Sequence, residues 1–351
     1  MNKKLITLAI AAAMVAPLAA AAETTLYGRV DTALTYLDED IAGSDGIWDV
    51  DTGTTRIGVK GSEDLGDGLK AIFQAEWQFT SSEGGSNDSI ASDVVDSNGN
   101  KTGDKANSGT FLNRLAFAGL SGDFGTVAIG RQWTPYYGAV DKTDIFNDPG
   151  NAGTGPNVVA ANKSYLGPSR TGNAIAYVSP NFSGLQGKLA LVIDNATGGT
   201  ASDGIDAYNP SLSYDNGPIS VGISTLQYDN DLGMQDIWGI GASYNFGMFT
   251  LIAQYEDMDE TDGTNANDGA NEWSIAGEAS FGNNIVRAVY GNIDYDSGNA
   301  EDETDTWGIG FQHNFSARTR VYAEYYNNDT NMRAAADEDK DAFSIGLRHD
   351  F

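Results

Sequence analysis

The sequence predicts an all-β protein, a transmembrane antiparallel β-barrel of about 16 strands with short turns at one end and long loops at the other. Three observations predict it. Apolar and polar residues alternate with a period of two along most of the chain, which is the spacing of strands and not of helices. Tight Gly, Asn and Asp turns alternate with long polar loops, an asymmetry typical of membrane barrels. Trp and Tyr, among them Trp133, Tyr136 and Tyr137, gather at the ends of the expected strands, where the membrane interfaces would lie.

The N-terminus is expected to be an export signal. Two lysines precede an apolar run at 5–15, and alanines at 20–22 are the small residues that a signal peptidase recognises. The alternative, a single membrane helix, is disfavoured by Pro17 and by the lack of a basic flank. We therefore expect residues 1–22 to be a cleaved signal peptide and residues 23–351 to form one barrel domain.

The strands follow from the alternation. In residues 68–80, Leu, Ala, Phe, Ala, Trp and Phe fill one face, while Lys, Gln, Glu and Gln fill the other. A sandwich of two sheets shows the same alternation, so the turn and loop lengths decide for the barrel. The pattern alone also allows 18 strands. The expected strands are 23–38, 54–66, 68–80, 110–121, 125–135, 173–180, 185–195, 207–216, 218–230, 235–246, 248–258, 271–282, 284–296, 305–315, 318–329 and 341–351.

A barrel of this size leaves a water-filled lumen, because side chains from so wide a wall cannot meet at the centre. Three expected loops are long, at 81–109, 138–172 and 259–270. The middle loop differs from the other two because it also has apolar side chains able to pack against another surface. Such a loop is typical of a functional segment. Its aspartates are Asp141, Asp144 and Asp148.

Composition excludes several classes of protein. The chain has 351 residues, no cysteine, 20 Lys and Arg against 49 Asp and Glu, and a formal net charge of −29. The absence of cysteine excludes disulfide scaffolds, cysteine nucleophiles and thiolate metal sites. The acidic charge argues against nucleic acid as a partner. The two histidines lie near strand ends, where an interfacial role is favoured over general-base catalysis. We expect no enzymatic activity, no cofactor and no metal.

Arginines on the expected strands point to the lumen. Arg29, Arg56 and Arg114 are assigned to the polar faces of their strands, and an arginine facing lipid near mid-membrane costs roughly 2–4 kcal/mol. Arg131 is expected to face outward unless its strand has a bulge. The alternative for each arginine is that of an ordinary lumen charge without a special role.

These segments resemble a known family. The segments 26–29 (Leu-Tyr-Gly-Arg), 56–61 and 114–120 (Arg-Leu-Ala-Phe-Ala-Gly-Leu) and the terminal Phe351 are similar to recurring strand sequences of the general porins of Gram-negative outer membranes. The resemblance extends over residues 23–351. It implies a passive channel for small hydrophilic solutes and ions in the bacterial outer membrane and a homotrimer in contact with lipid and lipopolysaccharide. It also implies that the outer-membrane assembly machinery recognises Phe351.

The resemblance implies a site as well. In this family the third loop folds into the lumen, where its carboxylates face a basic cluster on the wall. Asp144 and Asp148 match the loop carboxylates, with Asp141 nearby. The chain departs from the family at the loop tip, where it reads Asn-Asp-Pro-Gly at 147–150 in place of Pro-Glu-Phe-Gly. The matching wall residues are Arg29, Arg56, Arg114 and Arg170.

We expect weak cation selectivity. Acidic loops surround the mouth with negative potential that concentrates cations, although the wall arginines oppose it. The preference should weaken as salt rises, because the Debye length falls from about 10 Å at 0.1 M to about 3 Å at 1 M. Two alternatives stay open. A substrate-specific porin would show an aromatic track along the lumen, which is not evident in the sequence, and an adhesin barrel would have a plugged lumen.

Overall fold

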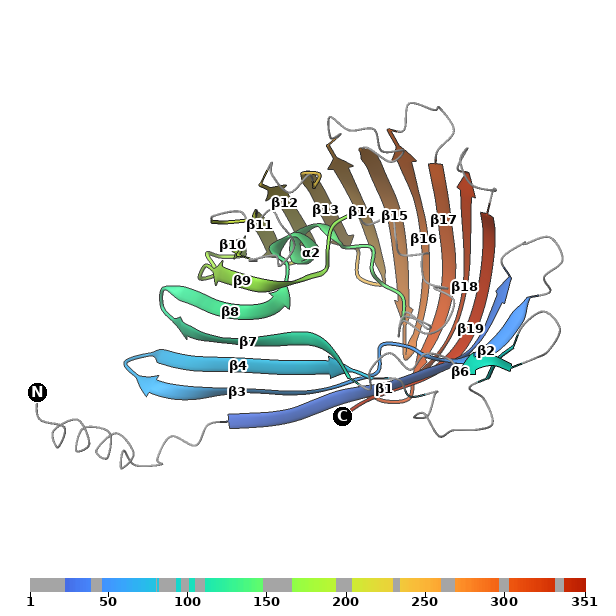
Figure 1. Ribbon diagram of the computed structural model, residues 1–351, viewed down its shortest axis with the longest axis horizontal. Helices are drawn as coiled ribbons and strands as arrows, with labels where there is room; N and C mark the ends of the chain where they lie inside the picture. Colours follow the sequence, from blue (N-terminus) through green and yellow to red (C-terminus); the bar gives the residue numbers. More distant parts are fainter. Residues whose placement is uncertain are drawn as a thin grey trace, which may run out of the picture.

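A computed structural model describes residues 23–38, 46–79, 81, 93–95, 101–104, 111–147, 166–193, 204–229, 234–259, 269–296, 303–331 and 338–351. Within these ranges the main sheet has 17 strands, of which the short β2 lies outside the ring, so that sixteen antiparallel strands close into a barrel (Figure 1). The predicted fold class is therefore confirmed. The ring closes through β1, which pairs with β19 along one edge and with β3 along the other.

The strands of the ring are β1 (Glu23–Asp38), β3 (Arg56–Gly66), β4 (Leu69–Gln78), β7 (Leu112–Gly122), β8 (Gly125–Trp133), β9 (Arg170–Val178), β10 (Leu185–Val192), β11 (Ala207–Asn216), β12 (Ile219–Tyr228), β13 (Ile237–Asn245), β14 (Phe249–Met258), β15 (Ala270–Phe281), β16 (Asn284–Tyr295), β17 (Glu303–Asn314), β18 (Thr319–Asn331) and β19 (Glu338–Asp350). Each overlaps a predicted strand. The largest differences are at β9, which begins at Arg170, and at β19, which begins at Glu338.

The sequence did not predict three short strands. β2 (Ile47–Thr52) pairs with the second half of β1, beyond the end of β3. Between β2 and β3 the chain passes so close to Asp31 that a Cβ at position 53 would lie 2.8 Å from the Asp31 Cγ, which explains the glycine there. β5 (Asp93–Val95) and β6 (Lys101–Asp104) form a separate pair. No helix in the described ranges is long and apolar enough to cross a membrane.

The outer face of the ring is apolar. Leu251, Ile309 and Leu347 are each more than half exposed, as lipid-facing side chains would be in the isolated chain. Aromatic side chains pair across neighbouring strands on this face, with ring centroids 5.1–5.6 Å apart. These pairs form part of the aromatic girdle that the sequence predicts. They are Trp238 with Tyr255, Trp273 with Tyr290, and Trp307 with Tyr325.

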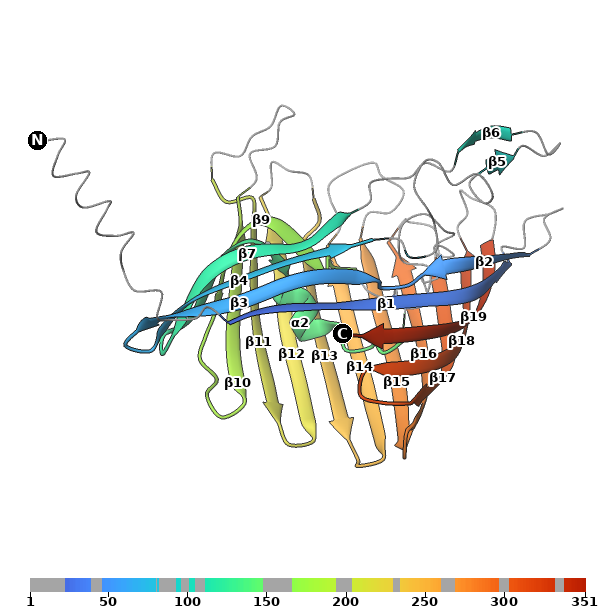
Figure 2. The ribbon, with the colours of Figure 1, turned by 90° about the horizontal axis from the view of Figure 1, so that it is seen from below.

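The apolar core lies inside the ring. The short helix α2 (Pro135–Val140) packs against β10–β14 within the barrel (Figure 1), and the view turned by 90° places it about midway along the strands (Figure 2). Buried Tyr136, Ala139 and Val140 meet apolar side chains of β11–β13 there. The approach is so close that a Cβ at Gly241 would lie 2.1 Å from the Val140 carbonyl oxygen. The predicted folding of the third loop into the lumen is therefore confirmed.

Candidate functional site

The third loop is anchored where it leaves the wall. The Thr134 hydroxyl accepts a hydrogen bond from the Tyr137 amide at 3.0 Å, which caps α2, and Pro135 occupies the first helical turn. The same hydroxyl donates to the Pro168 carbonyl oxygen at 2.7 Å. Thr134 therefore ties the first residue of the loop to the segment in which the loop ends.

Polar contacts then hold the loop along one side of the lumen. The Tyr136 amide donates to the Asn209 side chain of β11 at 3.0 Å. The Thr143 hydroxyl donates to Gln254 of β14 at 2.9 Å. Phe146 extends the contact to β18, because its ring packs on Tyr326 with centroids 5.1 Å apart. This side of the barrel runs from β11 to β18.

The predicted arginines lie on the other side of the lumen. Arg29 on β1 donates through Nε to Asp350 at 2.7 Å and through Nη1 to the Thr54 hydroxyl at 2.8 Å. The two hydrogen bonds fix the plane of the guanidinium group.

Arg56 and Arg114 share one carboxylate. Nε of Arg114 donates to Glu76 at 2.8 Å, and Nε of Arg56 lies 3.8 Å from the other oxygen of Glu76. Arg114 also donates to the Gln78 side chain at 2.9 Å. Glu76 therefore holds the arginines of β3 and β7 together across β4.

Arg170 extends this row to β9. Its Cζ lies 4.7 Å from the centroid of the Trp133 ring, and the Cζ of Arg114 lies 5.9 Å from the same centroid. Arg170 has no carboxylate within 4 Å among the residues that the structure describes. The four predicted arginines thus form a continuous row on strands β1 to β9.

Two irregularities in strand pairing shape this row. By strict alternation Arg114 would share the outer face with Leu120, but the β4–β7 register shifts between Glu76 and Trp77, and Arg114 turns inward. Arg114 therefore points inward as expected, but it does so through a bulge and not through the alternation of its strand. A second shift lies between Gly130 and Gln132, where two residues of β9, Gly172 and Asn173, face the single Arg131 of β8, so the extra residue is on β9 and not on the strand of Arg131. Nε of Arg131 donates to the Asn113 carbonyl oxygen at 3.1 Å.

The predicted loop aspartates have different environments. Asp144 accepts a hydrogen bond of 2.6 Å from the Tyr137 hydroxyl. Asp141 is half-buried, and in the described part of the protein its Oδ1 is buried without a hydrogen-bond partner. Burial, together with the nearby Asp144 and Glu256, raises the pKa of Asp141 well above its usual range. Asp148 lies outside the described residues.

The structure corrects the position of three aromatic residues that the sequence assigned to the interfacial girdle. Trp133 and Tyr137 stack inside the barrel, with centroids 4.8 Å apart and ring planes 17° apart. Tyr136, a residue of α2, is fully buried between the helix and the barrel wall. The period-two pattern missed Trp133 because the β8–β9 register shifts just before it, and it missed Tyr136 and Tyr137 because they lie on a helix and not on a strand. The Thr-Pro pair at 134–135, a helix-start signal, could have identified the short helix.

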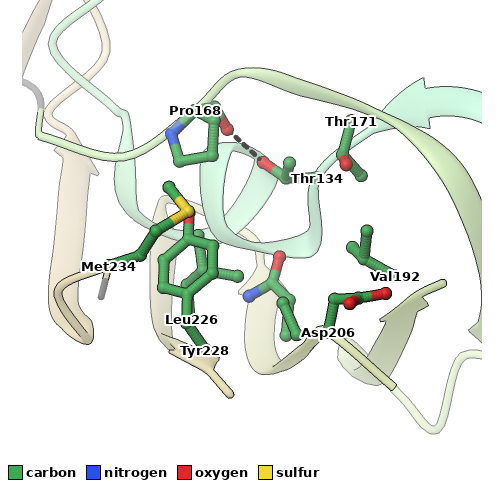
Figure 3. A pocket seen from close by; sticks show the side chains of 10 residues that line it. Thr134, Pro168, Thr171, Val192, Asp206, Leu226, Tyr228 and Met234 are labelled. Atoms are coloured by element: carbon green, nitrogen blue, oxygen red, sulfur yellow. Dashed lines mark hydrogen bonds between the residues drawn. The ribbon is translucent and has the colours of Figure 1, made fainter. Parts of the chain in front are cut away.

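A side pocket of about 260 Å³ lies beside the anchored end of the loop (Figure 3). Its walls are mainly apolar and include Leu226, Tyr228 and Met234, while Thr134 reaches it from the start of α2. The pocket is separate from the arginine row. Within the described ranges, no group of three or more His, Asp or Glu side chains is placed to hold a metal ion.

Phe351 closes the barrel seam. Its amide donates to the Gly28 carbonyl oxygen at 3.0 Å, and its own carbonyl oxygen accepts from the Gly28 amide at 3.1 Å. A Cβ at position 28 would lie 2.4 Å from the Phe351 ring, so glycine leaves space for the aromatic side chain. The ring remains 43% exposed on the outer face.

Comparison with known proteins gives consistent matches. A family model described as Gram-negative porin matches residues 8–350. Outer membrane porin protein 32 of Delftia acidovorans is 30% identical over 362 residues, which cover 99% of this chain and 93% of that protein. Major outer membrane protein P.IB of Neisseria meningitidis is 27% identical over 383 residues, with 100% of both chains covered.

Solved structures give the same result for the fold. The chain is similar to an anion-selective porin from Comamonas acidovorans, with a TM-score of 0.71 and 26% identity over 94% of this chain and 100% of that chain. It is also similar to OmpT of Vibrio cholerae in its trimer form, with a TM-score of 0.63 and 17% identity over 94% of this chain and 100% of that one. The second likeness concerns the fold alone.

Proposed function

Because the chain belongs to the Gram-negative porin family of the bacterial outer membrane, we propose that it is a passive diffusion channel for small hydrophilic solutes and ions. The members of this family are channels and not enzymes. One observation carries the proposal: the third loop lies inside the barrel along β11–β18, opposite a row of arginines on β1–β9. Solutes that cross the lumen would pass between these two surfaces.

The two surfaces explain selection by polarity. Arg29, Arg56, Arg114 and Arg170 line one side, and Asp144 projects from the loop on the other. Opposite charges across a narrow water-filled gap create a transverse field that orders water and favours polar over apolar solutes of equal width. Because Glu76 and Asp350 hold three of these arginines by hydrogen bonds or ion pairs, the field keeps a fixed direction.

The proposed ion selectivity depends on salt. At low salt the acidic loops favour cations weakly, because their potential extends over about 10 Å at 0.1 M. The arginine row acts at contact distance and is less screened. A similar porin is described as anion-selective, which supports an influence of this row on the permeating ions. We therefore expect the cation preference to weaken with salt and to give way to anion preference near 1 M.

Planar-bilayer recordings test both the proposed channel and its proposed ion selectivity. The reconstituted protein should give discrete ohmic conductance steps. In a twofold KCl gradient, the zero-current potential should have the sign of cation preference around 0.1 M and the opposite sign around 1 M. Absence of conductance would contradict the channel itself, and would favour a plugged adhesin barrel. A zero-current potential of the same sign at both salt concentrations would contradict only the proposed balance between the charges of the outer loops and those of the arginine row.

Assembly and processing complete the proposal. We expect a homotrimer in contact with lipid and lipopolysaccharide, because β1 and β19 carry exposed Leu26, Val30 and Leu347 on the outer face. Unboiled protein should migrate and sediment as a trimer, and a monomer would refute this assembly.

We also expect removal of residues 1–22 and recognition of Phe351 by the assembly machinery. N-terminal sequencing tests the first, and lower barrel assembly in Phe351→Ala tests the second.

A further inference from the structure

A stack of side chains connects the arginine row to the third loop. The Arg170 guanidinium lies over Trp133 at 4.7 Å, and Trp133 stacks on Tyr137 at 4.8 Å. The Tyr137 hydroxyl donates to Asp144 at 2.6 Å. Basic wall, aromatic pair and loop carboxylate therefore form one contiguous surface.

This aromatic surface belongs to the lumen and not to the lipid interface. The extra residue of β9 at 172–173 shifts the register so that Trp133 lies opposite Arg170, and the Trp133 ring contacts Tyr137 of a helix that lies inside the barrel. Trp133 nevertheless remains 38% exposed, and Tyr137 is half-exposed. Trp238, by comparison, is 41% exposed on the outer face. Trp133 and Tyr137 thus present exposed aromatic surface to solutes where the neighbouring groups are charged or polar.

Arg170 completes a recognition pattern. It is the one arginine of the row that has no carboxylate within 4 Å in the described ranges. Its guanidinium can donate paired hydrogen bonds to the carboxylate of a solute, while the aromatic ring of the same solute packs against Trp133 or Tyr137. An aliphatic anion of the same size can make the first contact but not the second.

We propose that Trp133, Tyr137 and Arg170 form a binding site for planar aromatic carboxylates, which the channel retains longer than aliphatic carboxylates of equal size and charge. The site rests on the proposed function as a diffusion channel and names a class of solute for it. It also supplies a local aromatic surface of the kind that a substrate-specific channel requires.

The test compares benzoate with cyclohexanecarboxylate. Both are ionised at pH 7.5 and have nearly the same size, but only benzoate is planar and aromatic. Each is added at rising concentration during single-channel recording in KCl, and the concentration that halves the chloride current is measured. Stacking worth about 0.5–1.5 kcal/mol predicts that benzoate blocks at roughly 2- to 12-fold lower concentration in the native channel.

Variants locate the effect. Trp133→Leu should bring the ratio of the two half-blocking concentrations close to one. Arg170→Gln should weaken the block by both anions. Trp238→Leu is the matched control, because it removes an equally exposed tryptophan from the outer face, and it should keep the native ratio. If Trp133→Leu fails to give channels, Trp133→Phe, with a smaller ring, should give an intermediate ratio.

Three results would overturn the site: equal block by both anions in the native channel, an unchanged ratio in Trp133→Leu or Trp133→Phe, or loss of the ratio in Trp238→Leu. These failures differ from failure of the proposed function. A protein that conducts chloride without discriminating between the anions is still a porin. A protein that conducts nothing refutes the channel itself.

Discussion

Asn147 fastens the third loop to Glu324 on β18. The Asn147 side-chain amide donates to Glu324 at 2.8 Å, and both side chains are buried. Arg287 lies 3.6 Å from the same carboxylate, so Glu324 is compensated by a charge as well as by hydrogen bonds. The loop is therefore held on β18 by specific contacts far from its anchored end at Thr134.

Breaking this contact should loosen the loop. Asn147→Ala removes the amide donor from a buried carboxylate, a loss of about 1.5–3 kcal/mol for a hydrogen bond to a charged group. The variant should show noisier current in single-channel recording and a lower thermal midpoint. Asn327→Ala is the control, because Asn327 bonds to Asp339 near the outer loops. Equal current noise and equal thermal midpoints in the two variants would show that Asn147 does not hold the loop.

Close packing of α2 on the wall should make Gly241 intolerant of any side chain. A Cβ there would lie 2.1 Å from the Val140 carbonyl oxygen, so Gly241→Ala must displace the helix, at a cost of about 1–3 kcal/mol. At Gly277 the nearest atom to an added Cβ is 3.9 Å away, and Gly277→Ala should be neutral. Thermal unfolding of both variants checks this. Equal midpoints would mean that α2 does not lie against β13.

The buried Asp141 predicts a pH dependence. Its pKa is raised in the folded protein, so folding favours the protonated form. The associated stability is present below the unfolded pKa of about 3.9 and is lost as the pH rises towards the raised folded value. Asp141→Asn should therefore exceed the native protein in thermal midpoint at pH 8, and the difference should shrink towards pH 4. A difference that is independent of pH would contradict the burial of this carboxyl.

Sequence periodicity predicted the ring because lipid outside and water inside impose alternation on every strand. The pairing of β15 with β16, for example, follows directly from two alternating segments and the short turn at 282–283. Bulges are different, since one extra residue reverses the faces that follow it. The shifts at Glu76 and at Gly130 therefore explain why the face of Arg114 and the location of Trp133 could not be derived from the pattern.

The site was only partly predictable for a second reason. Arg29, Arg56 and Arg114 could be named by resemblance because each lies in a segment similar to a strand sequence of the family, whereas Arg170 was matched by resemblance from within an expected loop. The environment of Asp141 depends on Glu256, and that of Asn147 on Glu324, and these partners are far away in the sequence. Contacts between a loop and a distant wall leave no local pattern, so the burial of Asp141 became apparent only in three dimensions.

Charge reversal on the loop should shift ion selectivity. Asp144→Lys replaces a negative charge opposite the arginine row by a positive one. The zero-current potential in a KCl gradient should then move towards anion preference at both 0.1 M and 1 M. Asp215→Lys makes the same change at an exposed position at the end of β11, and its effect should be confined to low salt. If Asp215→Lys shifts the 1 M potential as strongly, Asp144 does not lie at the narrow part of the lumen.

The most direct test of the central claim uses the absence of cysteine from the chain. Arg170→Cys places a single thiol in the proposed arginine row, and Ile175→Cys places one on the outer face of the same strand, where Ile175 is 36% exposed. A charged, membrane-impermeant thiol reagent is added during planar-bilayer recording. The account predicts a stepwise fall in current for Arg170→Cys and no change for Ile175→Cys. Unchanged current in Arg170→Cys, with the thiol shown to be intact, would contradict a water-filled lumen lined by the arginine row.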